Sequence, residues 1–72
     1  MTHVVRSNMA GTLLEFLVKT GDAVEEGQDV ATIESMKMHL ALQSDRKGRV
    51  AKLVVAPGAF VDDGAPILEL EV

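Results

Sequence analysis

One lysine stands between two methionines near the middle of this 72-residue chain, in the run Glu34-Ser35-Met36-Lys37-Met38. A free lysine amine is almost wholly protonated at neutral pH and is therefore a poor nucleophile. It accepts an acyl group only when an enzyme holds it, removes its proton and offers an activated acyl donor. Methionine is flexible, polarizable and apolar, which suits a recognition surface. The run predicts a lysine that is modified by an enzyme that recognises its neighbours.

The alternative for this run is a solvated turn lysine with the two methionines folded back onto the core. No other group of residues supports chemistry by the chain itself. The two histidines, His3 and His39, have no partners at metal-ligand spacing. No set of nucleophile, base and orienting residue can be assembled, so catalysis is the least supported class of function.

Size and composition favour one small domain that covers residues 1–72. A chain of this length hides roughly 60% of the surface that it exposes when unfolded. Hydrophobic residues make up 47% of the chain, which permits a packed core. There is no cysteine, which excludes disulfides and thiolate zinc sites and allows a reducing compartment.

The formal net charge of −4 argues against nucleic acid as a partner. The one basic cluster, Arg46, Lys47, Arg49 and Lys52, is interpreted as solvated charge around a turn, with a docking patch as the alternative. No apolar run approaches the roughly 20 residues of a membrane span, and the first residues lack the layout of a signal peptide. We therefore expect a cytoplasmic protein with no membrane partner, and Met1 favours a natural short protein over an excised domain.

The chain consists of two similar halves. At an offset of 37 positions, residues 11–34 align with residues 48–71 without a gap. Three pairs of glycines coincide in this alignment: Gly11/Gly48, Gly21/Gly58 and Gly27/Gly64. Glycine marks positions that need a positive φ or a close backbone approach. Two copies are too few for a solenoid, so the repeat predicts two halves related by a pseudo-two-fold axis.

Each half has the pattern of β-strands rather than of helices. Strands are predicted over residues 3–6, 12–18, 29–34, 38–43, 49–55 and 66–71, with very short strands at Val24 and Val61. In the last strand, apolar residues alternate with Glu69 and Glu71, the apolar ones being Leu68, Leu70 and Val72. The predicted fold class is all-β, with two small antiparallel sheets packed as a sandwich or flattened barrel.

The same strands place the lysine. Only Met36 and Lys37 separate two of the predicted strands, which predicts a two-residue hairpin loop. Neither residue is the glycine or asparagine that such loops favour, so the loop carries a conformational cost. The pseudo-symmetry puts this hairpin at one end of the domain and the C-terminus near the other. Lys37 is therefore expected at an exposed tip.

The run Glu34-Ser35-Met36-Lys37-Met38 resembles the attachment motif of biotinyl domains, in which a lysine between methionines is biotinylated. Three further segments, at residues 9–12, 21–28 and 45–50, resemble other parts of this family, so the resemblance covers essentially the whole chain. It is closest to short bacterial biotin/lipoyl attachment proteins and to the C-terminal biotinyl domains of carboxylases. It implies a flattened β-barrel of two four-stranded sheets, the barrel-sandwich hybrid.

The resemblance also implies a function and the residues that serve it. A biotin protein ligase would attach biotin covalently to Lys37, recognising Met36 and Met38, with Glu34 and Ser35 completing the motif. The biotin would carry a carboxyl group from a biotin carboxylase site to a carboxyltransferase site. The chain is then a biotin carboxyl carrier and not itself an enzyme.

Two alternatives to the biotin carrier stay open. Within the family, lipoate on Lys37 is the alternative, although related lipoyl domains usually carry Asp-Lys-Ala at this place. Outside it, the alternative is an unmodified β-domain that serves as an interaction module.

Two residues depart from the family's pattern. His39 stands where many relatives have glutamate or another polar residue, and Asn8 where many have proline. We interpret His39 as a partly exposed strand residue without a special role, with tuning of docking as the alternative. No insertion lies between Phe16 and Gly21, so the protruding thumb of acetyl-CoA carboxylase carriers is expected to be absent.

Overall fold

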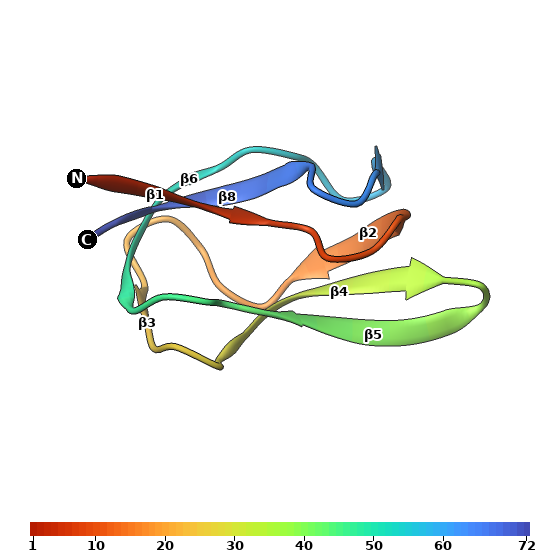
Figure 1. Cartoon of the computed structure of the whole chain (residues 1–72), viewed down its shortest axis with the longest axis horizontal. Helices are drawn as coiled ribbons and strands as arrows, with labels where there is room; N and C mark the ends of the chain where they lie inside the picture. Colours follow the sequence, from red (N-terminus) through yellow and green to blue (C-terminus); the bar gives the residue numbers. More distant parts are fainter.

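The computed structural model describes all 72 residues, and every regular element in it is a β-strand. The strands are β1 (Thr2–Arg6), β2 (Gly11–Phe16), β3 (Ala23–Val24), β4 (Asp29–Ser35), β5 (Met38–Gln43), β6 (Gly48–Leu53), β7 (Phe60–Val61) and β8 (Pro66–Glu71). They form two four-stranded antiparallel sheets, sheet A in the order β1-β8-β6-β3 and sheet B in the order β5-β4-β2-β7. The molecule is elongated, 33 × 18 × 18 Å (Figure 1). The predicted all-β flattened barrel is confirmed, and no helix long and apolar enough to span a bilayer occurs.

The core lies between the two sheets as one cluster of 13 buried hydrophobic residues. Each two-residue strand contributes one of them, Val24 in β3 and Val61 in β7, and both are almost fully buried. The predicted short strands are therefore confirmed, because each buries one valine between turns. Val72 lies beyond the end of β8 and is 40% exposed, so the expected apolar stripe of this strand is buried only at Leu68 and Leu70.

Two predicted strands end two residues earlier than expected, those over residues 12–18 and 49–55. In the first, the register with β4 shifts between Leu13 and Glu15. A bulge of this kind bends the strand and increases its twist. The chain therefore leaves the sheet after β2, although Val18 still packs into the core.

Backbone hydrogen bonds show the relation between the two halves directly. Equivalent bonds recur at the 37-residue offset: Leu17 N to Val30 O and Val54 N to Ile67 O at 2.9 Å, Gly21 N to Val50 O at 2.8 Å, and Gly58 N to Leu13 O at 2.7 Å. The same offset converts the strand order of sheet A into that of sheet B, since β1, β8, β6 and β3 correspond to β5, β4, β2 and β7. Each sheet thus takes strands from both halves, and the predicted pseudo-two-fold relation is confirmed.

Two buried serines extend this relation beyond the aligned residues. The hydroxyl of Ser7 donates to Met9 O and accepts from Met9 N at 3.2 Å. The hydroxyl of Ser44 donates to Arg46 O at 2.6 Å and accepts from Arg46 N at 3.3 Å. Each serine therefore fixes the turn that leads into a central strand, β2 in one half and β6 in the other.

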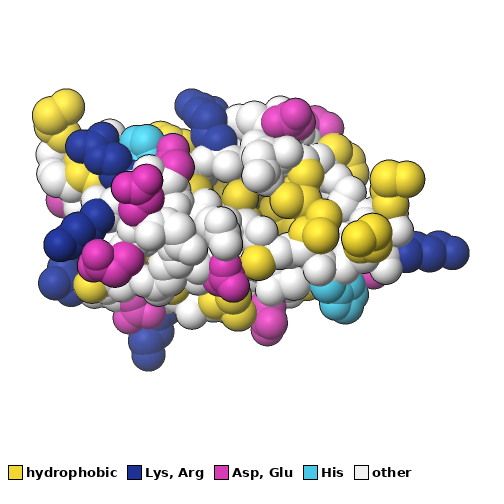
Figure 2. All heavy atoms as spheres, turned by 60° about the horizontal axis from the view of Figure 1, so that its bottom comes forward, with side chains coloured by type: hydrophobic (Ala, Val, Ile, Leu, Met, Phe, Trp, Pro, Cys, Tyr) yellow, Lys and Arg dark blue, Asp and Glu magenta, His cyan; other side chains and the backbone are white.

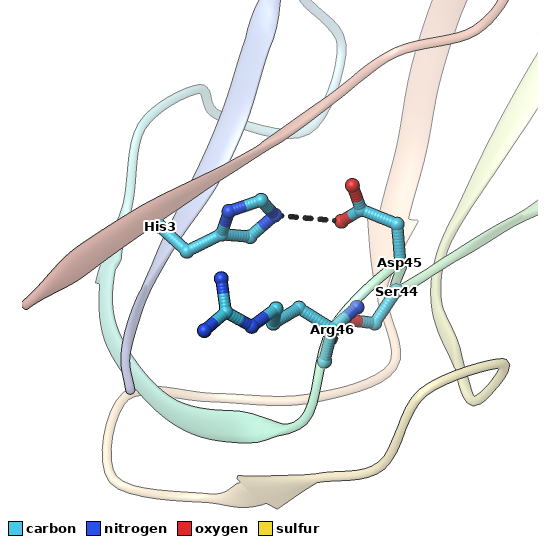
Figure 3. Close-up of polar contacts among 4 residues, drawn as sticks. All are labelled: His3, Ser44, Asp45 and Arg46. Carbon is cyan, nitrogen blue, oxygen red and sulfur yellow. Dashed lines mark hydrogen bonds and ion pairs between the residues drawn. The ribbon is translucent and has the colours of Figure 1, made fainter.

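The turn after β5 is also tied to the first strand. Nε2 of His3 lies 2.8 Å from Oδ1 of Asp45, beside Ser44 and Arg46 (Figure 3). This contact joins an edge strand of sheet A to a connection that leaves sheet B. His3 thus links the two sheets through a polar contact, and it lies away from Lys37.

The two chain termini lie side by side at the end of the barrel opposite the β4–β5 hairpin (Figure 1). The Met1 ammonium donates to Val72 O at 3.2 Å and to Glu71 Oε1 at 3.0 Å. At the 37-residue offset, Met36 corresponds to a position just after Val72, and Lys37 to one just before Met1. The termini therefore meet where a second hairpin would lie, and the predicted placement of hairpin and C-terminus at opposite ends is confirmed.

Candidate functional site

The lysine lies in a hairpin whose backbone is left-handed at both loop residues. The Ser35–Met38 pair closes the loop, with Met36 at φ 53° and Lys37 at φ 65°. These are the only non-glycine residues of the chain with positive φ. A two-residue loop of type I′ requires positive φ at both positions, and each costs a residue with a Cβ about 1–2 kcal/mol. The predicted hairpin loop is confirmed, and both loop residues have the positive φ on which its predicted conformational cost rests.

The base of the hairpin is held by the core and by close packing of β2. Ile33 is fully buried and pairs with Leu40, which is the partly buried residue of β5 nearest the tip. A Cβ added at Gly11 would lie 2.3 Å from the carbonyl oxygen of Glu34. Glycine is therefore required there for β2 to approach the end of β4. The hairpin is rigid at its base and stands clear of the core at its tip.

The side chains at the tip point into solvent. Met36 is 92% exposed and Met38 is 58% exposed, and Lys37 is exposed between them. The alternative in which both methionines fold back onto the core is therefore wrong. Basic spheres project from the hairpin end of the molecule with hydrophobic spheres beside them (Figure 2). No ion pair involves the Lys37 ammonium, so the amine is free to be taken up by another protein.

The other residues of the motif form the two sides of the hairpin. Glu34 and His39 lie opposite each other on β4 and β5, with Oε2 and Nε2 3.6 Å apart and both side chains largely exposed. A pair this long and this exposed contributes little to stability. Ser35 belongs to the pair that closes the loop. The structure thus brings all five motif residues together in one hairpin.

The lysine does not line any hollow of the surface. One hollow of about 390 Å³ opens between β1 and β5, and another of about 500 Å³ lies beside the termini. Neither of these, nor a smaller hollow beside Phe16 and Asp22, contains Lys37. No cluster of three or more His, Asp or Glu side chains is arranged to hold a metal ion. The arrangement displays an amine to another protein and does not enclose a substrate around it.

Sequence reasoning did not single out Phe60, which lies on the same face as part of the motif. Phe60 on β7 pairs with Thr12 on β2, Thr12 pairs with Glu34, and Glu34 pairs with His39. These four residues form one row across sheet B, and Phe60 is 66% exposed. The alignment of the two halves could have revealed Phe60, because the residue that aligns with it in the first half is the small Ala23. The exposed aromatic ring is a feature of the lysine end alone.

Comparison with known proteins gives matches over nearly the whole chain. A family model described as "Biotin-requiring enzyme" matches residues 3–70. The biotin/lipoyl attachment protein of Bacillus subtilis (strain 168) is 46% identical over 66 residues, which are 92% of this chain and 90% of that protein. The human mitochondrial propionyl-CoA carboxylase alpha chain is 40% identical over 70 residues, which are 97% of this chain and 10% of the carboxylase chain.

Two further similarities bear on the group that is attached. The dihydrolipoyllysine-residue acetyltransferase component of the pyruvate dehydrogenase complex of Pseudomonas aeruginosa is 40% identical over 76 aligned positions, covering all of this chain and 14% of that protein. The crystal structure of Kluyveromyces lactis urea carboxylase matches with a TM-score of 0.91 at 25% identity, over 99% of this chain and 6% of that chain. The chain thus spans a small part of these large enzymes and most of the Bacillus protein. These matches show that the chain belongs to the biotin/lipoyl attachment domain family, as a carrier domain and not as an enzyme.

Proposed function

We propose that this protein is a biotin carboxyl carrier whose Lys37 is the attachment site. The observation that carries the proposal is the hairpin tip, where the amine stands between exposed methionines on a backbone that is left-handed at both loop residues. The fold provides only one such tip. The relatives that are carboxylases support biotin as the attached group.

The residues present fit the attachment of a carboxylic acid through an amide. The ε-amine of Lys37 loses its proton and attacks the acyl carbon of biotinyl-adenylate, the N–C bond forms, and AMP leaves with the electron pair of the broken C–O bond. The ligase supplies the activated acyl group and the base, since the chain places no base beside the amine. What the chain supplies is a rigid, accessible nucleophile with apolar neighbours that a ligase can grip.

When attached, biotin supplies a carrier for a carboxyl group that is passed between two enzyme sites. The role of this chain is to hold that carrier on a tip and to bring it to a biotin carboxylase and then to a carboxyltransferase. The strands β4 and β5 extend the tip beyond the core, so the barrel itself does not obstruct entry into a partner's site. Tethering raises the effective concentration of the group at both sites without any catalytic residue in the carrier.

Lipoate is the second candidate for the same amine. The acetyltransferase relative from Pseudomonas and the name of the Bacillus protein favour it. The methionines on both sides of Lys37 and the carboxylase relatives favour biotin. Both candidates use the same tip, so they differ in the ligase that recognises it.

Parallel incubations with the two kinds of ligase test the proposal. The apo chain is incubated with ATP and either biotin plus a biotin protein ligase or lipoate plus a lipoate ligase, and its intact mass is measured. We expect one biotinyl group per chain, faster uptake of biotin than of lipoate, and no uptake by Lys37→Arg, whose guanidinium is not an acyl acceptor.

Two outcomes would count against the proposal. Faster uptake of lipoate would favour the second candidate. A chain that accepts neither group would indicate an unmodified interaction module.

A further inference from the structure

An exposed aromatic side chain lies near the lysine tip and has no role in the barrel. Of the two phenylalanines in the chain, Phe16 packs against the core, whereas Phe60 is 66% exposed. Phe60 lies at the same end of the barrel as the exposed Met36 and Met38. Several large apolar side chains exposed at one end commonly mark a site of protein association. Aromatic residues are also enriched among the few that dominate binding energy in an interface.

The sheet register places this ring within reach of a protein that holds the lysine. Phe60, Thr12, Glu34 and His39 lie in one row across sheet B. Neighbouring strands are about 4.8 Å apart, so Phe60 lies about 10 Å across the sheet from Glu34. Glu34 in turn directly precedes Ser35, which forms with Met38 the pair that closes the loop. A partner that covers the tip can therefore cover this row as well.

The two sheets differ in the charges of their strands. The strands of sheet B contain three carboxylates, no Lys and no Arg, and their one basic side chain is His39 opposite Glu34. The strands of sheet A contain three cations and two carboxylates. The lysine tip is therefore attached to the more acidic of the two sheets.

Cross-strand neighbours make this difference sharper. In sheet A, Glu71 lies opposite Arg49 and Glu69 lies opposite Lys52. The corresponding neighbours in sheet B pair two of its carboxylates with threonines, Glu34 with Thr12 and Glu15 with Thr32. The third carboxylate, Asp29, lies opposite Gln43. Opposite charges on neighbouring strands neutralise one another in sheet A, whereas no carboxylate of sheet B has a lysine or arginine on a neighbouring strand. Sheet B therefore presents a negative field that attracts a basic partner surface.

We propose that the outer face of sheet B around the row Phe60–Thr12–Glu34–His39 is the surface on which the biotin protein ligase docks. Phe60 inserts into an apolar pocket of the ligase, and the carboxylates of sheet B face basic side chains around that pocket. The inference rests on the proposed function, because it assigns the face through which the acylating enzyme holds the carrier while Lys37 reacts. It adds an anchor and a charged face to the recognition provided by the two methionines.

Steady-state kinetics of biotin transfer test the role of the ring. Initial rates are measured with the full apo chain, a biotin protein ligase, ATP and biotin, over a range of carrier concentrations. We expect Phe60→Ala to raise the KM for the carrier about tenfold and to leave kcat within twofold, because the ring contributes to binding and not to the reacting amine. Phe60→Leu, which keeps an apolar side chain, restores most of the affinity. Leu17→Ala is the matched control, since Leu17 is 49% exposed just after the far end of β2 from the tip.

A matched pair of charge reversals tests whether the ligase contacts sheet B rather than sheet A. Glu15→Lys on sheet B and Glu69→Lys on sheet A change the net charge equally on opposite sheets. We expect the first to lower kcat/KM for the carrier about fivefold at low salt, with the loss diminishing as salt is added, and the second to have less than a twofold effect. Thermal unfolding of every variant shows whether the fold is retained.

The outcomes separate this inference from the proposed function. If the wild-type chain is acylated but Phe60→Ala has an unchanged KM, or if both charge reversals slow acylation equally, the docking surface is wrong and the carrier function stands. If the wild-type chain accepts no biotin at all, both are overturned. Direct titration of the ligase with the non-acylatable Lys37→Arg chain gives the same comparison for binding alone.

Discussion

The two ends of the barrel are built from equivalent strands in equivalent register, yet only one of them carries a hairpin with a lysine at its tip. At one end, β4 turns back into β5 through Met36 and Lys37. At the other, the chain termini meet, with the Met1 ammonium bonded to Val72 O. Gly11 and Gly48 pack closely against the corresponding strand at each end. The scaffold is thus shared, and the proposed function depends on the two residues that close one of its ends.

The surface rows beside the two ends differ in the same way. The row at the hairpin end reads Phe60, Thr12, Glu34, His39, and the equivalent row at the terminal end reads Ala23, Arg49, Glu71, Thr2. The inward-facing residues of the two halves remain apolar throughout. Divergence between the halves is therefore concentrated on the surface, where it changes the exposed side chains without changing the fold.

Substitution of the two end glycines should give the largest difference between the ends. A Cβ at Gly11 would meet the Glu34 carbonyl oxygen at 2.3 Å, whereas at Gly48 the nearest atoms lie at 2.9 Å and one of them belongs to the exposed side chain of Val72. We expect Gly11→Ala to lower the free energy of unfolding by about 3 kcal/mol and Gly48→Ala by about 1 kcal/mol. Urea denaturation of both variants measures this, and equal losses would show that the hairpin end is not the tighter of the two.

Replacing the two loop residues with residues that accept positive φ should have a smaller effect on the free energy of unfolding, and of opposite sign. Asparagine and glycine adopt positive φ more readily than methionine and lysine do. The double variant Met36→Asn/Lys37→Gly should therefore raise the free energy of unfolding by about 1 kcal/mol while removing the acyl acceptor. Thermal and urea unfolding test this. A less stable variant would mean that the methionine and lysine side chains stabilise the loop by contacts that outweigh the cost of its backbone.

The two buried serines should give the smallest difference, since they have the same role in both halves. Ser7→Ala and Ser44→Ala each remove a hydroxyl that bonds both backbone groups of a turn residue. Each should lower the free energy of unfolding by about 1 kcal/mol. Ser35→Ala is the control, because Ser35 lies outside these turns and is only partly buried. Losses at Ser7 and Ser44 that differ widely would show that the two halves are not equivalent in energy.

Much of the fold was predictable because the repeat shows the pattern of most strands and turns twice. The pairs of glycines were predicted to need positive φ or close approach, and both kinds occur: Gly21 has φ 96°, while Gly11 meets the backbone of β4. The two-residue loop followed from the spacing of the strands around Met36 and Lys37. Strand ends were less predictable, since the bulge between Leu13 and Glu15 depends on pairing with β4 and leaves no local mark in the sequence.

The candidate site was predictable in its tip and not in its surroundings. The exposure of Met36 follows from the loop geometry, and the hairpin was already expected. The place of Phe60 in a row with Glu34 depends on two non-local strand pairings, β7 with β2 and β2 with β4. A period-two pattern in a strand of only two residues cannot reveal which strand lies beside it. Ser7 and Ser44 were missed for a different reason. Their hydrogen bonds are local, to Met9 and Arg46, but both serines lie outside the aligned residues 11–34 and 48–71.

We infer that its position at the hairpin tip makes Lys37 the acceptor among the four lysines of the chain. The other three are Lys19, Lys47 and Lys52. Tandem mass spectrometry of peptides from the wild-type chain, after incubation with biotin protein ligase, ATP and biotin, tests this most directly. We predict that the biotinyl group is found on Lys37 and that the other three lysines are unmodified. A biotinyl group on any of those three, or a fully unmodified chain, would contradict the assignment of Lys37 as the acceptor.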